Sequence, residues 1–179
     1  EISNCASYCV YVAGGKHNFV HNTIAAYYGY PYTNLNIHNN ILADDVAAVY
    51  INNLSKNNAK TNSSFSNCII TGGRKNNLVV ATPLSDYYEG RFEGNYLRTD
   101  SLDKVYAKNN VYASDSDSCV FRNIYYLYKE YHYYDFRLDS LSPARGIGDS
   151  IVALSYPQDR AGNRRKQYPD AGCYEYLEE

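Results

Sequence analysis

The 179-residue sequence contains no methionine, no tryptophan and only 5 phenylalanines. It also lacks any apolar run that approaches the roughly 20 residues of a transmembrane helix, so we expect no membrane span in it. An excess of charge of one sign is missing too, because the net charge is −2. Nucleic-acid-binding domains carry a basic face, and we therefore expect no nucleic-acid partner.

Signatures of several enzyme and metal-site classes are also absent. The sequence has no GxSxG, Walker or dinucleotide-binding motif, and its cysteines form no CxxC pair for a zinc site. The cysteines number 5, which is odd, whereas a disulfide framework uses an even set. We predict that most of them are reduced and buried: Cys5, Cys9, Cys68, Cys119 and Cys173.

Tyrosine and asparagine are abundant instead, with 22 tyrosines. Asparagine forms helices poorly and tyrosine favours strands, so the composition disfavours a helical bundle. A short pattern recurs along the chain: an apolar residue, any residue, Asn, a small polar residue and an apolar residue. The third position of this pattern is occupied by Asn4, Asn22, Asn39, Asn67, Gly94 and Asn109.

The recurring pattern has a spacing of about 20 residues, which is typical of β-solenoids. Asparagine tolerates the left-handed backbone of a sharp corner, and glycine is the other residue suited to it. Amide side chains can also form a hydrogen-bonded ladder between coils. We therefore predict stacked parallel coils with these residues aligned at one corner and with polar surface loops at residues 26–36, 52–64 and 71–77. A β-sandwich or propeller would lack the fixed Asn column.

The C-terminal sequence carries a more specific pattern. Residues 141–149 read LSPARGIGD, residues 159–165 read DRAGNRR, and residues 169–176 read PDAGCYEY. Together they resemble the SPAxG, DxxGxxR and PDxGxYE tail of right-handed parallel β-helix surface proteins of Bacteroidota. These pectate-lyase-like chains are often described as choice-of-anchor proteins or lipoproteins.

This resemblance implies an all-β fold: a right-handed parallel β-helix (β-solenoid) with an Asn ladder and an irregular C-terminal cap. We expect stacked coils over residues 1–137 and a capping tail over residues 138–179. Because the chain starts inside a repeat, we interpret it as the C-terminal part of a longer protein. The resemblance further implies export and an outer-membrane surface location, with a lipid anchor in an upstream part.

Two histidines are the weak candidates for catalysis. His21 and His38 precede the corner asparagines of consecutive coils, so we expect them to lie side by side on an outward column with Glu93 and Lys108. Similar β-helices act on acidic polysaccharides with such a column, and a histidine can act as the proton acceptor. A solvated face on which two histidines happen to stack is the alternative interpretation. Only a lyase would require calcium, for which Asp44, Asp45, Asp115 and Asp117 are weak candidates, and we expect no other cofactor or metal.

Four tyrosines crowd one predicted loop around Pro31, and we predict that they bind a ligand: Tyr27, Tyr28, Tyr30 and Tyr32. Exposed tyrosines can stack on sugars or anchor a protein partner, although they can also simply cover the side of the solenoid. Our leading hypothesis is a non-catalytic glycan-binding or assembly component on the cell surface. The alternatives are a polysaccharide lyase or hydrolase and a structural subunit of an outer-membrane complex. The expected partner is therefore a polysaccharide or an outer-membrane protein.

Overall fold

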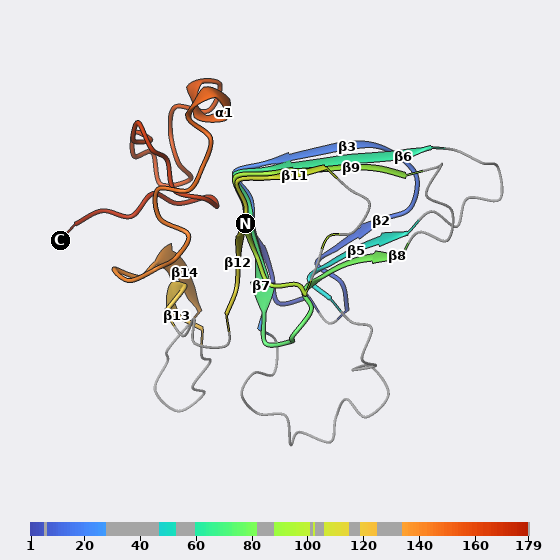
Figure 1. Cartoon of the computed structure of the whole chain (residues 1–179). Coiled ribbons are helices and arrows are strands. Elements are labelled where there is room, and N and C mark those ends of the chain that lie inside the picture. Colours follow the sequence, from blue (N-terminus) through green and yellow to red (C-terminus); the bar gives the residue numbers. More distant parts are fainter. Residues whose placement is uncertain are drawn as a thin grey trace, which may run out of the picture.

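The computed structural model describes residues 1–5, 7–27, 47–52, 60–81, 88–100, 102, 106–114, 119–124 and 134–178. Within these residues, strands β1 to β12 form three parallel sheets, and the chain visits the sheets in a fixed order (Figure 1). Three successive coils pass from the three-stranded sheet to the four-stranded sheet and then to the five-stranded sheet, and β11 and β12 of the next coil belong to the last two of these sheets. This topology confirms the predicted all-β parallel β-helix.

The sheets are built from short strands that pair in register between successive coils. The three-stranded sheet contains β2 (Val10–Val12), β5 (Val49–Asn52) and β8 (Leu78–Ala81). The four-stranded sheet contains β3 (Gly15–Val20), β6 (Thr61–Ser66), β9 (Tyr88–Glu93) and β11 (Tyr106–Lys108). The five-stranded sheet contains β1 (Ile2–Ser3), β4 (Thr23–Ala26), β7 (Ile69–Gly72), β10 (Tyr96–Leu97) and β12 (Val111–Tyr112).

The interior of the coils follows from the two-residue period of the strands. On β6 and β9 every second residue is buried, because successive side chains point to opposite faces of a sheet. Phe19, Phe65 and Phe92 occupy the same position in three coils, and their rings stack with centroids 4.6 and 5.2 Å apart. This stack lies in the principal hydrophobic core.

The middle strands of the five-stranded sheet, β4, β7 and β10, are buried on both faces. All four residues of β7 are inaccessible to solvent, as expected for a parallel sheet that is covered on each side. Ile70 belongs to the core inside the coils, whereas Ile69 belongs to a second core. That second core contains Phe121, Phe136 and Leu138 from the C-terminal part of the chain.

The C-terminal part contains β13 (Phe121–Asn123), which pairs antiparallel with β14 (Asp135–Leu138), and the helix α1 (Ser150–Leu154). It lies beside the five-stranded sheet, as the orange and red ribbon in Figure 1 shows. Gly172 N donates to Asn67 O over 2.8 Å, and Cys173 N donates to Thr23 Oγ1 over 3.1 Å. The irregular C-terminal segment therefore covers the side of the coils.

A left-handed corner joins the four-stranded sheet to the five-stranded sheet. The residues at this corner in the described coils all have positive φ: His21 (51°), Asn67 (54°), Gly94 (65°) and Asn109 (54°). The predicted column is thus confirmed for Asn67, Gly94 and Asn109 but wrong for Asn22, which lies one residue past the corner. Asn4 follows Ser3, the partner of Ala25, and so lies at the other end of the five-stranded sheet. Asn39 is outside the described residues.

The asparagine ladder lies one residue after the corner, at positions that pair between coils. Asn95 Nδ2 donates to Asn110 Oδ1 over 2.9 Å, and Asn95 Oδ1 accepts from Cys68 N over 2.7 Å. Asn22 occupies the equivalent place in the first coil, where its Nδ2 donates to Val20 O. The amides thereby satisfy backbone groups that the turn leaves unpaired.

Two other sequence expectations need correction. The polar stretch predicted as a loop at residues 52–64 includes the start of β6, and the stretch at residues 71–77 includes the end of β7. No disulfide joins any of the five cysteines, and Cys68 and Cys173 are buried as predicted. Cys5, however, is exposed, and Cys9 and Cys119 are only partly buried, so the prediction that most of the cysteines are buried is wrong. Burial raises the pKa of Cys68 to about 12, so this thiol stays protonated at neutral pH.

Candidate functional site

His21 lies at the corner between β3 and β4, where it is enclosed by the C-terminal part. Its side chain is 6 % exposed, Asn67 Nδ2 donates to its Nε2 over 3.1 Å, and its ring meets the Tyr156 ring edge-on. The outward column that we predicted for it contains Val20, Ser66, Glu93 and Lys108 instead. The prediction that His21 belongs to an exposed column is therefore wrong, because the corner is displaced by one residue in this coil.

The environment of His21 also determines its charge. Burial, reinforced by the positive charge of Arg165, lowers the pKa of His21 from 6.5 to about 4. The imidazole is consequently neutral at physiological pH. A lyase would need an accessible histidine as its proton acceptor, whereas His21 is packed between the coils and the C-terminal segment.

Tyr27 belongs to the second hydrophobic core. Its side chain is 5 % exposed, its ring packs near Phe121 and Phe136, and its hydroxyl lies 3.3 Å from Thr71 Oγ1. This ring is not available to a ligand, so Tyr27 is corrected to a core residue. The ligand-binding role of Tyr28, Tyr30 and Tyr32 stays a prediction, because these tyrosines and His38 lie outside the described residues.

The calcium candidates Asp44, Asp45, Asp115 and Asp117 also lie outside the described residues. Within the part of the chain that the structure describes, no three or more histidine, cysteine, aspartate or glutamate side chains are grouped so that they could hold a metal ion.

A cluster of tyrosines lies on the outer face of the three-stranded sheet. Tyr11 on β2 and Tyr50 on β5 are paired positions, and their rings are stacked with centroids 5.7 Å apart and an interplanar angle of 3°. The centroid of the Tyr8 ring lies 4.8 Å from the centroid of the Tyr50 ring. Tyr11 is 52 % exposed. We call Tyr8, Tyr11 and Tyr50 the tyrosine cluster.

The sequence repeat did not predict the tyrosine cluster, because that repeat is defined by its asparagines. A signal was present, since Val10-Tyr11-Val12 and Val49-Tyr50-Ile51 repeat an apolar, tyrosine, apolar triplet. Such a triplet on a strand points both tyrosines to the same face, opposite the core valines.

The cluster is connected to the predicted tyrosine loop through the topology of the coil. Tyr8 lies in the segment that leads from β1 in the five-stranded sheet to β2 in the three-stranded sheet. The loop with Tyr28, Tyr30 and Tyr32 makes the same connection one coil later, from β4 to β5. The described strand ends from which these two connections start lie side by side, since Ser3 of β1 pairs with Ala25 of β4.

The outer face of the four-stranded sheet is polar. Ser64 Oγ donates to Asn18 Oδ1 over 2.8 Å, and Asn62 Nδ2 donates to Glu89 Oε2 over 3.3 Å. The Arg91 guanidinium lies 4.7 Å from the centre of the Tyr106 ring. These groups pair mainly with one another across coils, so they form a solvated face of surface ion pairs and hydrogen bonds.

The charged residues of the tail motifs hold the C-terminal segment together. Asp159 Oδ1 accepts from the backbone N–H groups of Ala161 and Asn163, and its Oδ2 accepts from Glu175 N. Burial disfavours ionisation of Asp159, but these hydrogen bonds outweigh it and lower its pKa. Arg165 and Glu175 form a buried ion pair of 2.9 Å. The motif residues of the tail thus explain its folding.

Comparison with known proteins gives no relative. No family model matches the chain, and neither the curated proteins nor the solved structures contain a significant match. Among the described residues, no helix is both long and apolar enough to cross a membrane.

Proposed function

We propose that this β-solenoid is a non-catalytic glycan-binding component of an exported, surface-attached bacterial protein. The observation that carries the proposal is the tyrosine cluster on the outer face of the three-stranded sheet. The similarity of the C-terminal tail to surface β-helix proteins of Bacteroidota supports export and a lipid-anchored outer-membrane location.

Tyr11 is the residue best placed to contact a sugar. It lies on β2, the edge strand of the three-stranded sheet in the described part of the chain, and Tyr50 stacks on one face of its ring. Contact with Tyr8 and Tyr50 restricts the rotamers of the ring, which reduces the entropy lost on binding. An aromatic ring with a hydroxyl at its edge offers a sugar both an apolar surface and a hydrogen-bonding group.

The proposal is tested by affinity electrophoresis and calorimetry with a panel of soluble polysaccharides, including galactan, xylan and polygalacturonate. Stacking on an aromatic ring contributes about 1–3 kcal/mol for nucleotide bases, and we expect the lower end for sugars. Tyr11→Ala should therefore weaken binding about tenfold, whereas the matched control Tyr112→Ala should not. Tyr112 is also a strand residue, 43 % exposed, but lies on the five-stranded sheet.

The outcomes separate the three hypotheses. Failure of the native chain to bind any member of the panel, or equal binding by Tyr11→Ala, would refute the proposal. Appearance of unsaturated sugar products during incubation would favour a lyase. Capture of a defined outer-membrane protein in a Tyr11-dependent way, with no polysaccharide bound, would favour a structural subunit of a complex.

A further inference from the structure

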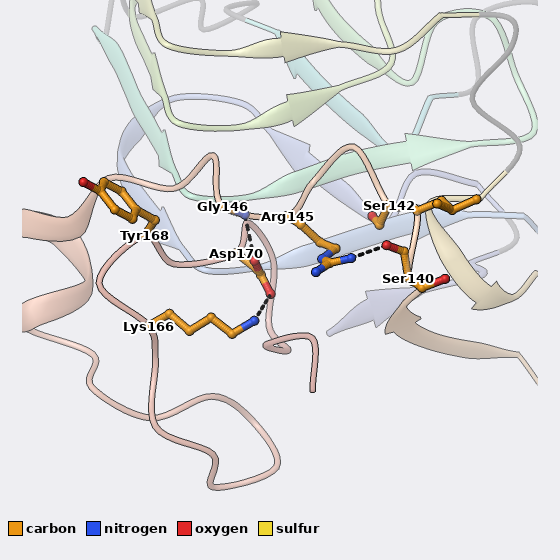
Figure 2. Close-up of a pocket in the computed structure, with 8 residues that line it drawn as sticks. Ser140, Ser142, Arg145, Gly146, Lys166, Tyr168 and Asp170 are labelled. Carbon is orange, nitrogen blue, oxygen red and sulfur yellow. Dashed lines mark hydrogen bonds and ion pairs between the residues drawn. The ribbon is translucent and has the colours of Figure 1, made fainter. Parts of the chain in front are cut away.

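Figure 2 shows an open depression in the C-terminal segment, whose charged side chains are engaged with their neighbours. Asp170 Oδ1 accepts from Gly146 N over 2.7 Å, and Asp170 Oδ2 lies 3.9 Å from Lys166 Nζ. Arg145 donates to Ser140 O. These contacts hold the segment together and account for the charges at this surface. The thiols of the chain, by contrast, include two that lie close to each other and differ in exposure.

Cys5 and Cys9 lie in the connection that leads from β1 to β2, with three residues between them. Cys5 Sγ lies 3.8 Å from Ser3 O at the end of β1. Cys9 Sγ lies 3.9 Å from Ala25 O on β4. Because Ser3 and Ala25 are paired positions of these neighbouring strands, both sulfur atoms lie beside one place on the five-stranded sheet.

The Cys9 side chain also turns back towards the start of its own segment. Asn4 N donates to Ala25 O over 2.9 Å, at the same oxygen that the Cys9 thiol approaches. The backbone N–H groups of Asn4 and Cys5 act on Cys9 Sγ, and the Cys5 thiol forms a side-chain hydrogen bond with the Cys9 thiol. The fold, and not only the spacing in the sequence, therefore brings the two thiols together.

The two thiols differ in their access to a dissolved reagent. Cys5 is exposed, whereas Cys9 is partly buried and packs against the principal core. Burial and the neighbouring Cys5 raise the pKa of Cys9 to about 11, so this thiol stays protonated at neutral pH. Cys5 is therefore the thiol that a reagent meets first. Redox-sensitive cysteines have the same arrangement, with an accessible thiol beside a second, resolving cysteine.

We propose that Cys5 and Cys9 form a redox modification site, which a low-molecular-weight disulfide oxidises reversibly to an intramolecular disulfide. The Cys5 thiolate attacks one sulfur of the reagent RSSR, forms a Cys5–SR mixed disulfide and releases one thiolate, which takes up a proton. Cys9 then loses its proton, attacks Cys5 Sγ, closes the Cys5–Cys9 bond and expels the second RS⁻. Two protein thiols thus lose two electrons and two protons, and one reagent disulfide becomes two thiols.

Equilibration with mixtures of reduced and oxidised glutathione tests the proposal, followed by acid quenching, alkylation and peptide mapping by mass spectrometry. The experiment is done in native buffer and in urea that unfolds the chain. Because the fold holds both thiols together, we expect the equilibrium constant for the Cys5–Cys9 disulfide to be at least tenfold larger in the folded chain. Cys119→Ser is the matched control, since it removes another partly buried thiol and should leave this equilibrium unchanged.

Two further variants separate the roles of the two thiols. Cys9→Ser should stop at the mixed disulfide of Cys5 with glutathione. Cys5→Ser should react with glutathione at Cys9 at least tenfold more slowly than Cys9→Ser reacts at Cys5, because the Cys9 thiol is shielded and protonated.

Equal equilibrium constants in the folded and unfolded chains would overturn the proposal. A mixed disulfide that persists in the native chain without ring closure, or Cys5-linked dimers in place of the intramolecular bond, would overturn it as well. The measurement needs no polysaccharide, so its result is independent of the test of the tyrosine cluster.

Discussion

At the scale of single residues, the left-handed corner shows how several side chains can serve one backbone conformation. Asn67 and Asn109 have φ of 54°, Gly94 has 65° and His21 has 51°. Histidine shares with asparagine an enrichment at positive φ, although a repeat pattern built on asparagine does not include it. His21 therefore keeps the corner and adds a titratable group, whereas the other described coils have Asn67, Gly94 and Asn109 at this position.

Because the imidazole of His21 titrates, we predict that the stability of the protein depends on pH. The native pKa of His21 is about 4, below its value of 6.5 in the unfolded chain, so the unfolded state binds more protons between these values. The contribution is fully present above pH 6.5 and is lost as the pH falls towards 4. Since one pKa unit corresponds to about 1.4 kcal/mol, the loss at pH 4.5 is roughly 2–3 kcal/mol.

His21→Asn is the appropriate comparison, because asparagine accepts the corner backbone and does not titrate. Urea unfolding at pH 7 and pH 4.5 should show a loss of unfolding free energy that is roughly 2–3 kcal/mol larger in the native chain than in the variant. The carboxylates with lowered pKa values, such as Asp135 and Asp159, act alike in both proteins. Equal losses would mean that His21 is protonated without cost in the folded state.

At the scale of elements, the solenoid was predictable because the repeat is a property of local sequence. The Asn or Gly position of the repeat predicts the corner at Asn67, Gly94 and Asn109, and thereby the start of the strand that comes after each corner. The pattern misplaced the first two coils, where Ile2-Ser3-Asn4 and Val20-His21-Asn22 match it equally well in a different register. Register there is set by tertiary pairing, such as Ser3 with Ala25, which a short motif does not encode.

The ladder asparagines carry a prediction for these elements. Asn95 Oδ1 accepts from Cys68 N, and its Nδ2 donates to Phe65 O and to Asn110 Oδ1. Asn95→Ala leaves the buried N–H of Cys68 and the buried C=O of Phe65 without their partner, at a cost of roughly 1–3 kcal/mol for each group. We therefore expect chemical denaturation to show a loss of roughly 2–6 kcal/mol of unfolding free energy.

The control for this prediction is Asn62→Ala, because Asn62 is on the solvated face and its amide bonds to exposed Glu89. We expect a change below about 0.5 kcal/mol for this surface substitution. If the two variants were equally stable, the ladder would contribute no more than a surface hydrogen bond.

The candidate site was less predictable than the fold. The sequence places Tyr11 and Tyr50 on equivalent strand positions only once β2 and β5 are known to pair, across 38 residues of intervening chain. Tyr27 lies in the second core because the C-terminal part covers the five-stranded sheet, a contact with Phe121 and Phe136 that no local pattern reveals. Long-range packing thus decides which tyrosines are surface and which are core.

At the scale of the whole molecule, the C-terminal segment and the coils share one core. Asp149 N donates to Asn67 Oδ1, and Asn67 Nδ2 donates to Asp149 O, so a corner asparagine bonds directly to the segment. Gly172 also packs against the coils, with Thr23 and Ile69 as its neighbours. Because these contacts join the second core, we expect the two parts to unfold in one cooperative transition.

Two glycines of the segment allow this coupling to be measured. Gly172 and Gly162 have nearly the same left-handed φ, +90° and +88°. A Cβ on Gly172 would lie 2.7 Å from Thr23 Oγ1 and 2.8 Å from Ile69 Cδ1, whereas a Cβ on Gly162 would meet no atom within 4 Å. The alanine variants therefore share the backbone strain, about 1–2 kcal/mol, and differ in the clash with the coils.

We expect Gly162→Ala to lower the free energy of unfolding by about 1–2 kcal/mol, with a single transition retained. Gly172→Ala should lower it by a further 1–3 kcal/mol, the usual cost of forcing extra volume into a packed interface. These losses are tested by monitoring unfolding with far-UV circular dichroism and, in parallel, with limited proteolysis of the C-terminal segment. Equal losses of unfolding free energy in the two variants would show that the segment moves away from the coils without cost. A separate early transition in the native chain would show that the segment folds independently of the corner that it covers.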